Sequence, residues 1–205
     1  MDPAMNGLVL DSMGMLAPVL LVSAMGILMM VLAAVMHPLP RTLGWGVTMF
    51  SLAGALALVA LDAGAPTAEA FAGMVRDDLY GDFFAVVVLL GSIFALLISD
   101  DYLERINVRV GEFYALFLFA VSGMLGMVYA NDLMMLFITL EVMSIALYVL
   151  CAIKRSDERS VESGFKYFIL GAFSSGILLY GISFIYGATG TTSLSQLASW
   201  LATHP

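Results

Sequence analysis

Cysteine, histidine and basic residues are all scarce in this sequence. Its one cysteine excludes a disulfide framework. Its two histidines, His37 and His204, lie outside the apolar stretches and leave no ligand set for zinc, copper or haem inside a membrane. Lysine and arginine number 8 against 16 acidic residues, a net charge of -8, so the basic surface that binds nucleic acid is also missing. We expect no metal, no redox cofactor and no nucleic-acid partner for this chain.

Apolar residues, by contrast, dominate the chain. They make up 61% of it and charged residues 12%, whereas soluble domains have about 45–50% apolar and about 25% charged residues. A helix needs roughly 20 apolar residues to cross a bilayer core of about 30 Å. Runs near that length cover residues 16–36, 43–61, 83–99, 113–130, 133–153 and 163–186. We therefore predict an all-α polytopic membrane protein, with residues 1–205 in a single membrane domain.

The fourth and fifth runs are separated only by Asn131 and Asp132. A single helix through both would be about 60 Å long, twice the bilayer core, and Asn and Asp favour turns. We therefore expect a tight helical hairpin at these two residues. After the sixth run, Ser193 and Gln196 have the spacing of a capping box, which predicts a short helix over residues 194–203 on the outer face of the membrane.

The basic residues fall in alternate loops, which predicts the orientation of the chain. The positive loops should be cytoplasmic, so both termini should lie outside. These loops hold Arg41, then Arg105 and Arg109, then Lys154, Arg155 and Arg159. The acidic loop with Asp62, Glu69, Asp77 and Asp78 is expected to be a solvated outer surface. Asp2 and Asp11 precede the first run where a signal peptide would be basic, so we expect that run to remain in the mature protein.

Glu141 stands near the middle of the fifth run. A charge at the centre of a transmembrane helix costs roughly 2.5–3.5 kcal/mol, and such residues usually mark ion or proton pathways. Ser144 and Tyr148 follow at i+3 and i+7 on the same helical face, so Glu141 is predicted to lie in a polar stripe that could hold water. The alternative is a protonated Glu141 that makes a structural hydrogen bond between helices.

Lys166, near the start of the sixth run, is the second candidate. Ser174 lies eight residues later and continues a partly polar face. A carboxylate and a lysine at different depths can relay protons when partial burial lets both titrate near neutral pH, with water between them. The alternative is a surface pair with Glu162, four residues earlier, in which the lysine reaches the interface.

Small residues at helical spacing favour close packing over ligand binding. They are Ser122, Gly123 and Gly126 in the fourth run, and Gly171, Ser175, Gly176 and Gly181 in the sixth.

Three segments of the sequence resemble a known family. Residues 111–124 (GEFYALFLFAVSGM) and 131–141 (NDLMMLFITLE) resemble the antiporter-like membrane subunits of respiratory complex I. Residues 159–192, which begin RSVESGFKYFILGAFSSG, resemble the subunit N branch of that family in bacteria. The resemblance implies that Glu141 and Lys166 serve proton translocation; the spacing arguments above add Ser144, Tyr148 and Ser174 as the polar stripe that supports them.

The resemblance also implies the setting of the chain. It would be a non-redox subunit of a proton-translocating NADH:quinone oxidoreductase in the bacterial inner membrane, with NADH, FMN, iron–sulfur clusters and quinone bound by partner subunits. Family members contain two inverted helical units, so six helices are only a portion, and another polypeptide or a further part of this one would supply the remainder. Two alternatives stay open: a subunit of a multi-subunit cation/proton antiporter, and a purely structural membrane piece.

Overall fold

The computed structural model describes residues 13–36, 39–62, 64–106 and 110–204. His37, Arg109, Asp2 and Asp11, which entered the arguments above, lie outside the described residues. The described helices are α2 (Ala17–Val35), α3 (Arg41–Asp62), α4 (Leu79–Ile106), α5 (Val110–Val128), α6 (Leu133–Cys151), α7 (Glu158–Thr189) and α8 (Leu194–Thr203). By length and composition, α2 to α7 can each cross a membrane. The all-α membrane architecture and the six spans are therefore confirmed.

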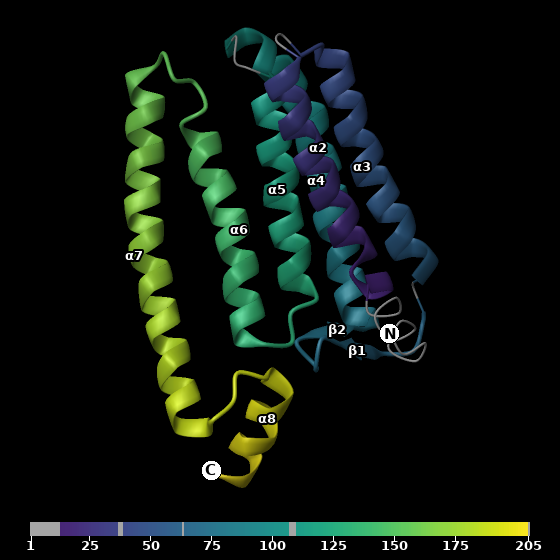
Figure 1. Ribbon diagram of the computed structural model, residues 1–205, viewed down its shortest axis with the longest axis vertical. Helices are drawn as coiled ribbons and strands as arrows, with labels where there is room; N and C mark the ends of the chain where they lie inside the picture. Colours follow the sequence, from purple (N-terminus) through teal and green to yellow (C-terminus); the bar gives the residue numbers. More distant parts are fainter. Residues whose placement is uncertain (1–12, 37–38, 63, 107–109, 205) are drawn as a thin grey trace.

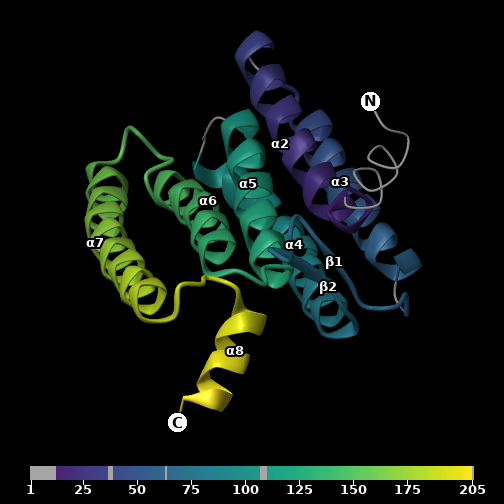
Figure 2. The ribbon, with the colours of Figure 1, turned by 60° about the horizontal axis from the view of Figure 1, so that its bottom comes forward.

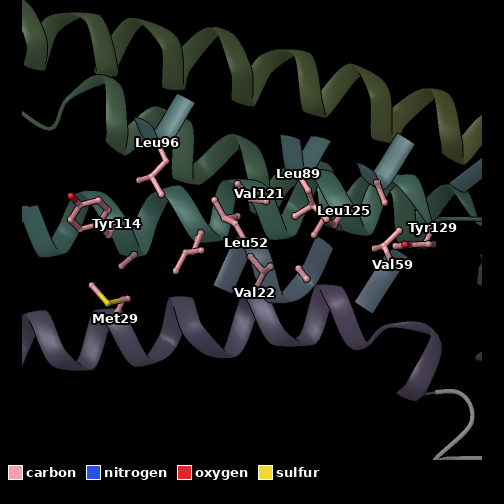
Figure 3. Packing of buried hydrophobic residues seen from close by; sticks show 14 of the residues in the cluster. Val22, Met29, Leu52, Val59, Leu89, Leu96, Tyr114, Val121, Leu125 and Tyr129 are labelled. Atoms are coloured by element: carbon pink, nitrogen blue, oxygen red, sulfur yellow. The ribbon is translucent and has the colours of Figure 1, made fainter. Parts of the chain in front are cut away.

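Helices α2 to α5 form a bundle with a buried core, and α6 and α7 extend it to one side (Figure 1). Side chains from all four bundle helices meet in this core, where Leu52, Leu89 and Tyr114 are fully buried (Figure 3). Helix α5 packs on α2 and on α6, whereas α7 packs chiefly on α6. As a result 56% of the α5 span is buried but only 6% of the α7 span.

The tight turn between α5 and α6 is confirmed. The side chain of Asp132 caps α6 by accepting hydrogen bonds from the backbone N–H groups of Met134 and Met135. Close approach of the two helices requires glycine: a Cβ on Gly123 would lie 2.5 Å from the Met143 nitrogen, and one on Gly126 would lie 2.5 Å from Thr139 Cγ2. The small residues of the fourth run therefore serve packing, as predicted.

Helix α4 is longer at both ends than the apolar run over residues 83–99. Its last turns contain Asp100 and Glu104, which bind Arg41 at the start of α3 with N–O distances of 2.8 and 2.9 Å. Because these carboxylates are satisfied by an arginine of the neighbouring helix, the helix continues past the point where its apolar pattern stops.

A β-hairpin between α3 and α4 was not predicted. Strands β1 (Ala68–Ala70) and β2 (Val75–Asp77) pair antiparallel, and the turn places Phe71, Ala72 and Gly73 at positive φ. The hairpin is tied to the α5–α6 turn, because Arg76 N donates to Tyr129 O at 3.0 Å. Strands of three residues are too short to show an alternating pattern.

Helix α8 begins where the capping box predicts. The Ser193 side chain accepts from Gln196 N. The segment before α8 returns to the α5–α6 turn, where Leu194 N donates to Asn131 O at 3.0 Å and Leu133 N donates to Thr192 O at 2.9 Å. The β-hairpin, the α5–α6 turn and the start of α8 thus meet at one end of the molecule (Figure 2). We call this the acidic end, and the opposite end, with residues 39–41, 100–106, 110–112 and 152–159, the basic end.

Candidate functional site

Glu141 lies near the middle of α6, nine residues after the capping residue Asp132. That separation corresponds to about 13 Å along the helix axis. Its side chain is partly buried, and its Oε1 atom is fully enclosed without a hydrogen-bond partner among the described residues. The hydrogen bond between helices that the alternative interpretation requires is therefore not formed by this oxygen atom. Enclosing a carboxyl oxygen without a hydrogen-bond partner costs free energy.

Lys166 lies near the start of α7 and forms an ion pair with Glu162. Its Nζ is 2.5 Å from Glu162 Oε1, and the two side chains are 69% and 61% exposed. The structure thus contains the i,i+4 surface pair considered above. Whether the lysine also serves proton transfer remains a prediction.

Two glycine contacts fix the register of α7 on α6. A Cβ on Gly164 would lie 2.5 Å from Ala152 Cβ, and one on Gly171 would overlap the Tyr148 hydroxyl. Lys166 lies between these two contacts, at the level of residues 148–152 of α6. Its backbone is therefore offset from that of Glu141 by at least about 10 Å along the axis, and its ammonium group binds Glu162 instead.

The predicted polar stripe is only partly assembled. Ser144 is buried on α6. Tyr148 is also buried, but its ring packs edge-on against Tyr167 of α7 with centroids 4.8 Å apart. Ser174 is on the exposed part of α7, and its hydroxyl donates to Leu170 O within its own helix. Tyr148 thus has a packing role at the α6–α7 contact that its sequence position alone did not reveal.

Two polar contacts in the bundle escaped the sequence analysis. Ser23 of α2 and Ser122 of α5 share a hydrogen bond with their hydroxyl oxygens 2.5 Å apart. At the basic end, Arg41 binds Asp100 and Glu104, and Tyr114 OH donates to Asp100 Oδ1 at 3.4 Å. The i,i+4 spacing of Asp100 and Glu104 was a usable signal for the second contact.

The acidic end is less solvated than expected. Asp62, Asp77 and Asp82 line a cavity of about 210 Å³ together with Tyr129, and Asp82 is only 7% exposed. Burial, reinforced by the charges of Asp82 and Asp62, raises the pKa of Asp77 to about 6. Of the acids expected on a solvated outer surface, Asp62 and Glu69 are exposed, whereas Asp77 is partly buried because the β-hairpin folds it against the ends of α3 and α4. In the described parts of the chain, no cluster of three or more potential ligands is arranged for a metal.

Comparisons with known proteins place these features in context. The family model for NADH:quinone oxidoreductase/Mrp antiporter, TM, matches residues 130–204, which include Glu141 and Lys166. NADH-quinone oxidoreductase subunit N of Rhodospirillum rubrum is 39% identical over 187 residues, which are 91% of this chain and 38% of that protein. Subunit N of Trichlorobacter lovleyi is 47% identical over 133 residues, 65% of this chain and 27% of that protein. The chain thus spans about a quarter to two fifths of the length of these curated relatives.

Solved structures give the same picture of the fold. A chain of respiratory complex I from Thermus thermophilus with bound aureothin superposes with a TM-score of 0.71 and 31% identity, over 86% of this chain and 38% of that one. A chain of the membrane-bound sulfane sulfur reductase, an archaeal respiratory membrane complex, superposes with a TM-score of 0.71 at 23% identity, over 92% of this chain and 40% of that one. The second likeness concerns the fold alone.

Proposed function

We propose that this chain, a relative of NADH-quinone oxidoreductase subunit N with part of the antiporter-like fold, contributes to proton translocation driven by electron transfer in other subunits. The observation that carries the proposal is Glu141: an ionisable group at the middle of a membrane-spanning helix, with an enclosed oxygen that has no hydrogen-bond partner among the described residues. Such a group takes up or releases a proton in response to nearby charge.

The chain holds one point of a proton path and needs neighbours to complete it. The backbone of Lys166 is offset from that of Glu141 by at least about 10 Å along the axis. A cation that favours the ionised form of Glu141 must therefore come from elsewhere or act through water. Helix α7 has 32 residues and buries little of its surface within this chain. Its open faces fit the remaining helices of an antiporter-like unit, which we propose as partners together with other membrane subunits.

The energy must come from those partners. Moving one proton against 100 mV costs about 2.3 kcal/mol. This chain has one cysteine and, in its described part, no group of three or more residues that could hold a metal ion. We propose that NADH, FMN, iron–sulfur clusters and quinone are bound by other subunits. By the distribution of basic loops we propose an inner-membrane location with the basic end in the cytoplasm and both termini outside.

Glu141→Gln in the full-length protein tests the proposal. Inverted membrane vesicles energised with NADH should lose proton pumping at least several-fold, because glutamine has the shape of the acid but cannot carry the proton. Glu158→Gln, an exposed acid at the start of α7, is the matched control and should pump normally. An unchanged proton-to-electron ratio in Glu141→Gln would overturn the mechanism.

The same vesicles separate the remaining interpretations. A cation/proton antiporter subunit, which the family model also covers by its name, would exchange sodium for protons without NADH. A purely structural piece would tolerate Glu141→Gln but lose the assembled complex when α7 is deleted.

A further inference from the structure

A groove opens at the basic end between α2, α5 and α6. It encloses about 500 Å³, a volume within the range of small-molecule sites. Helix α5 contributes its floor through Leu116, while Met30 and Ala34 of α2 and Val149 of α6 form its sides. Met30, Ala34 and Val149 are exposed in the structure, so the groove faces outward from the bundle.

Two charged residues of opposite sign line the same groove. Glu112 belongs to the first turn of α5 and Arg155 to the loop after α6. Arg155 Nη2 lies 3.0 Å from Glu112 Oε2, with the arginine side chain 71% exposed and the glutamate 32% exposed. Because both sit where their helices leave the apolar span, the pair lies at the headgroup level of the bilayer and the apolar walls lie below it.

The ion pair of Arg155 and Glu112 determines which lipid headgroup can bind in the groove. Inside a membrane an acyl chain gains little by leaving other lipid tails for an apolar wall, so the headgroup contacts determine which lipid stays. The neighbouring Lys154 is paired with Asp157 at 3.6 Å, so the two basic and two acidic side chains that the structure describes at the groove mouth balance in charge. The Glu112 carboxylate would repel an anionic headgroup. A zwitterionic headgroup carries a positive group that the same carboxylate can bind.

We propose that this groove binds one phosphatidylethanolamine molecule. The lipid phosphate binds the Arg155 guanidinium, its ammonium group binds the Glu112 carboxylate, and one acyl chain lies along Met30, Ala34 and Leu116. An exposed ion pair contributes only about 0–1 kcal/mol, so Arg155 and Glu112 can exchange part of their mutual contact for the headgroup at small cost. The site is independent of Glu141 and of the proposed proton path.

Lipid retention in the full-length protein tests the site. The protein is purified in mild detergent, exchanged into nanodiscs of equal phosphatidylethanolamine and phosphatidylglycerol, and the lipids that survive a second detergent wash are counted by mass spectrometry. The expected result is one retained phosphatidylethanolamine per copy, reduced at least fivefold by Glu112→Gln and by Arg155→Gln. Arg159→Gln, an exposed arginine on α7 that does not line the groove, is the matched control and should retain the lipid.

A second measurement locates the acyl chain. Phosphatidylethanolamine with a photoreactive group on its acyl chain should label peptides that contain residues 30–34 and 112–116, and Ala34→Trp should abolish this labelling because Ala34 is exposed in the groove. Labelling confined to other peptides would overturn the proposal. So would retention of phosphatidylglycerol that increases in Glu112→Gln, which is the result expected of a site for anionic headgroups.

Discussion

The hydroxyl of Thr192 donates a 2.6 Å hydrogen bond to Asp132 Oδ2, across sixty residues of sequence. The other oxygen of the same carboxylate accepts from Met134 N and Met135 N at the start of α6. One buried aspartate therefore begins a membrane helix and also holds the segment that leads into α8.

Asp132→Ala should destabilise the protein by about 2 kcal/mol, since a helix cap alone contributes about 0.5–2 kcal/mol and the bond to Thr192 is lost as well. Thr192→Val removes only the second contact and should cost about 1 kcal/mol or less. Thermal unfolding of the full-length protein in detergent measures both. Equal losses in the two variants would show that the cap contributes nothing.

Gly123→Ala and Gly91→Ala form a matched pair. A Cβ at Gly123 meets the backbone of Met143 at 2.5 Å, and this backbone cannot move aside, so the substitution should push α5 and α6 apart at a cost of about 1–3 kcal/mol. A Cβ at Gly91, an exposed residue of α4, meets nothing within 4 Å in the described structure. There alanine should be neutral or stabilising by up to about 1 kcal/mol, because it favours helix. The unfolding midpoints of the two variants should therefore shift in opposite directions, or only the first should shift.

The pKa of Asp77, raised to about 6, predicts how stability depends on pH. The folded state holds this proton more tightly than the unfolded state does, so between about pH 4 and pH 6 the native protein binds more protons. The contribution of Asp77 to stability therefore decreases as the pH rises through that window and stays low above it. Asp77→Asn should raise the unfolding midpoint at pH 7.5 relative to the parent and have a smaller effect at pH 4.5. Glu69→Gln, an exposed acid of strand β1, is the control and should change neither value.

Arg41→Ala should weaken the contact between α3 and α4 at the basic end, because Asp100 and Glu104 would lose their shared cation and repel each other. We expect a larger loss of stability than for an isolated surface pair, because one guanidinium serves two carboxylates. Arg41→Lys should recover only part of it, since an ammonium group cannot reproduce the two-sided geometry. Arg105→Ala removes the exposed arginine that follows Glu104 in the sequence and should be neutral in the same unfolding assay.

The features that could be predicted from the sequence are those that depend on the length and average polarity of a segment. The six spans followed from apolar runs, and the turn at Asn131 and Asp132 followed from the impossibility of one helix through both runs. The depth of Glu141 followed in the same way. The start of α8 came from local capping chemistry at Ser193.

What the sequence left open depends on the rotation of helices and on contacts distant in the chain. The packing of Tyr148 on Tyr167 requires Gly171 to face it, and no pattern within α6 contains that information. The β-hairpin is held by Tyr129, more than fifty residues away. Asp77 looked solvated because its neighbours in the cavity come from α3 and α4.

Because α7 is long, the depth of Lys166 in the membrane depends on the tilt of this helix. Its 32 residues measure about 48 Å, whereas the hydrocarbon core is about 30 Å thick. An upright α7 must project beyond the core, and its charged residues Glu158, Arg159 and Glu162 show that the projection is at the basic end. Lys166 is about 12 Å from the start of the helix, so in an upright α7 it lies on the projecting part, about 6 Å outside the core. When α7 tilts, its length along the membrane normal decreases and the Lys166 ammonium group moves toward the hydrocarbon core. The tilt of this one helix therefore determines how much water surrounds Lys166.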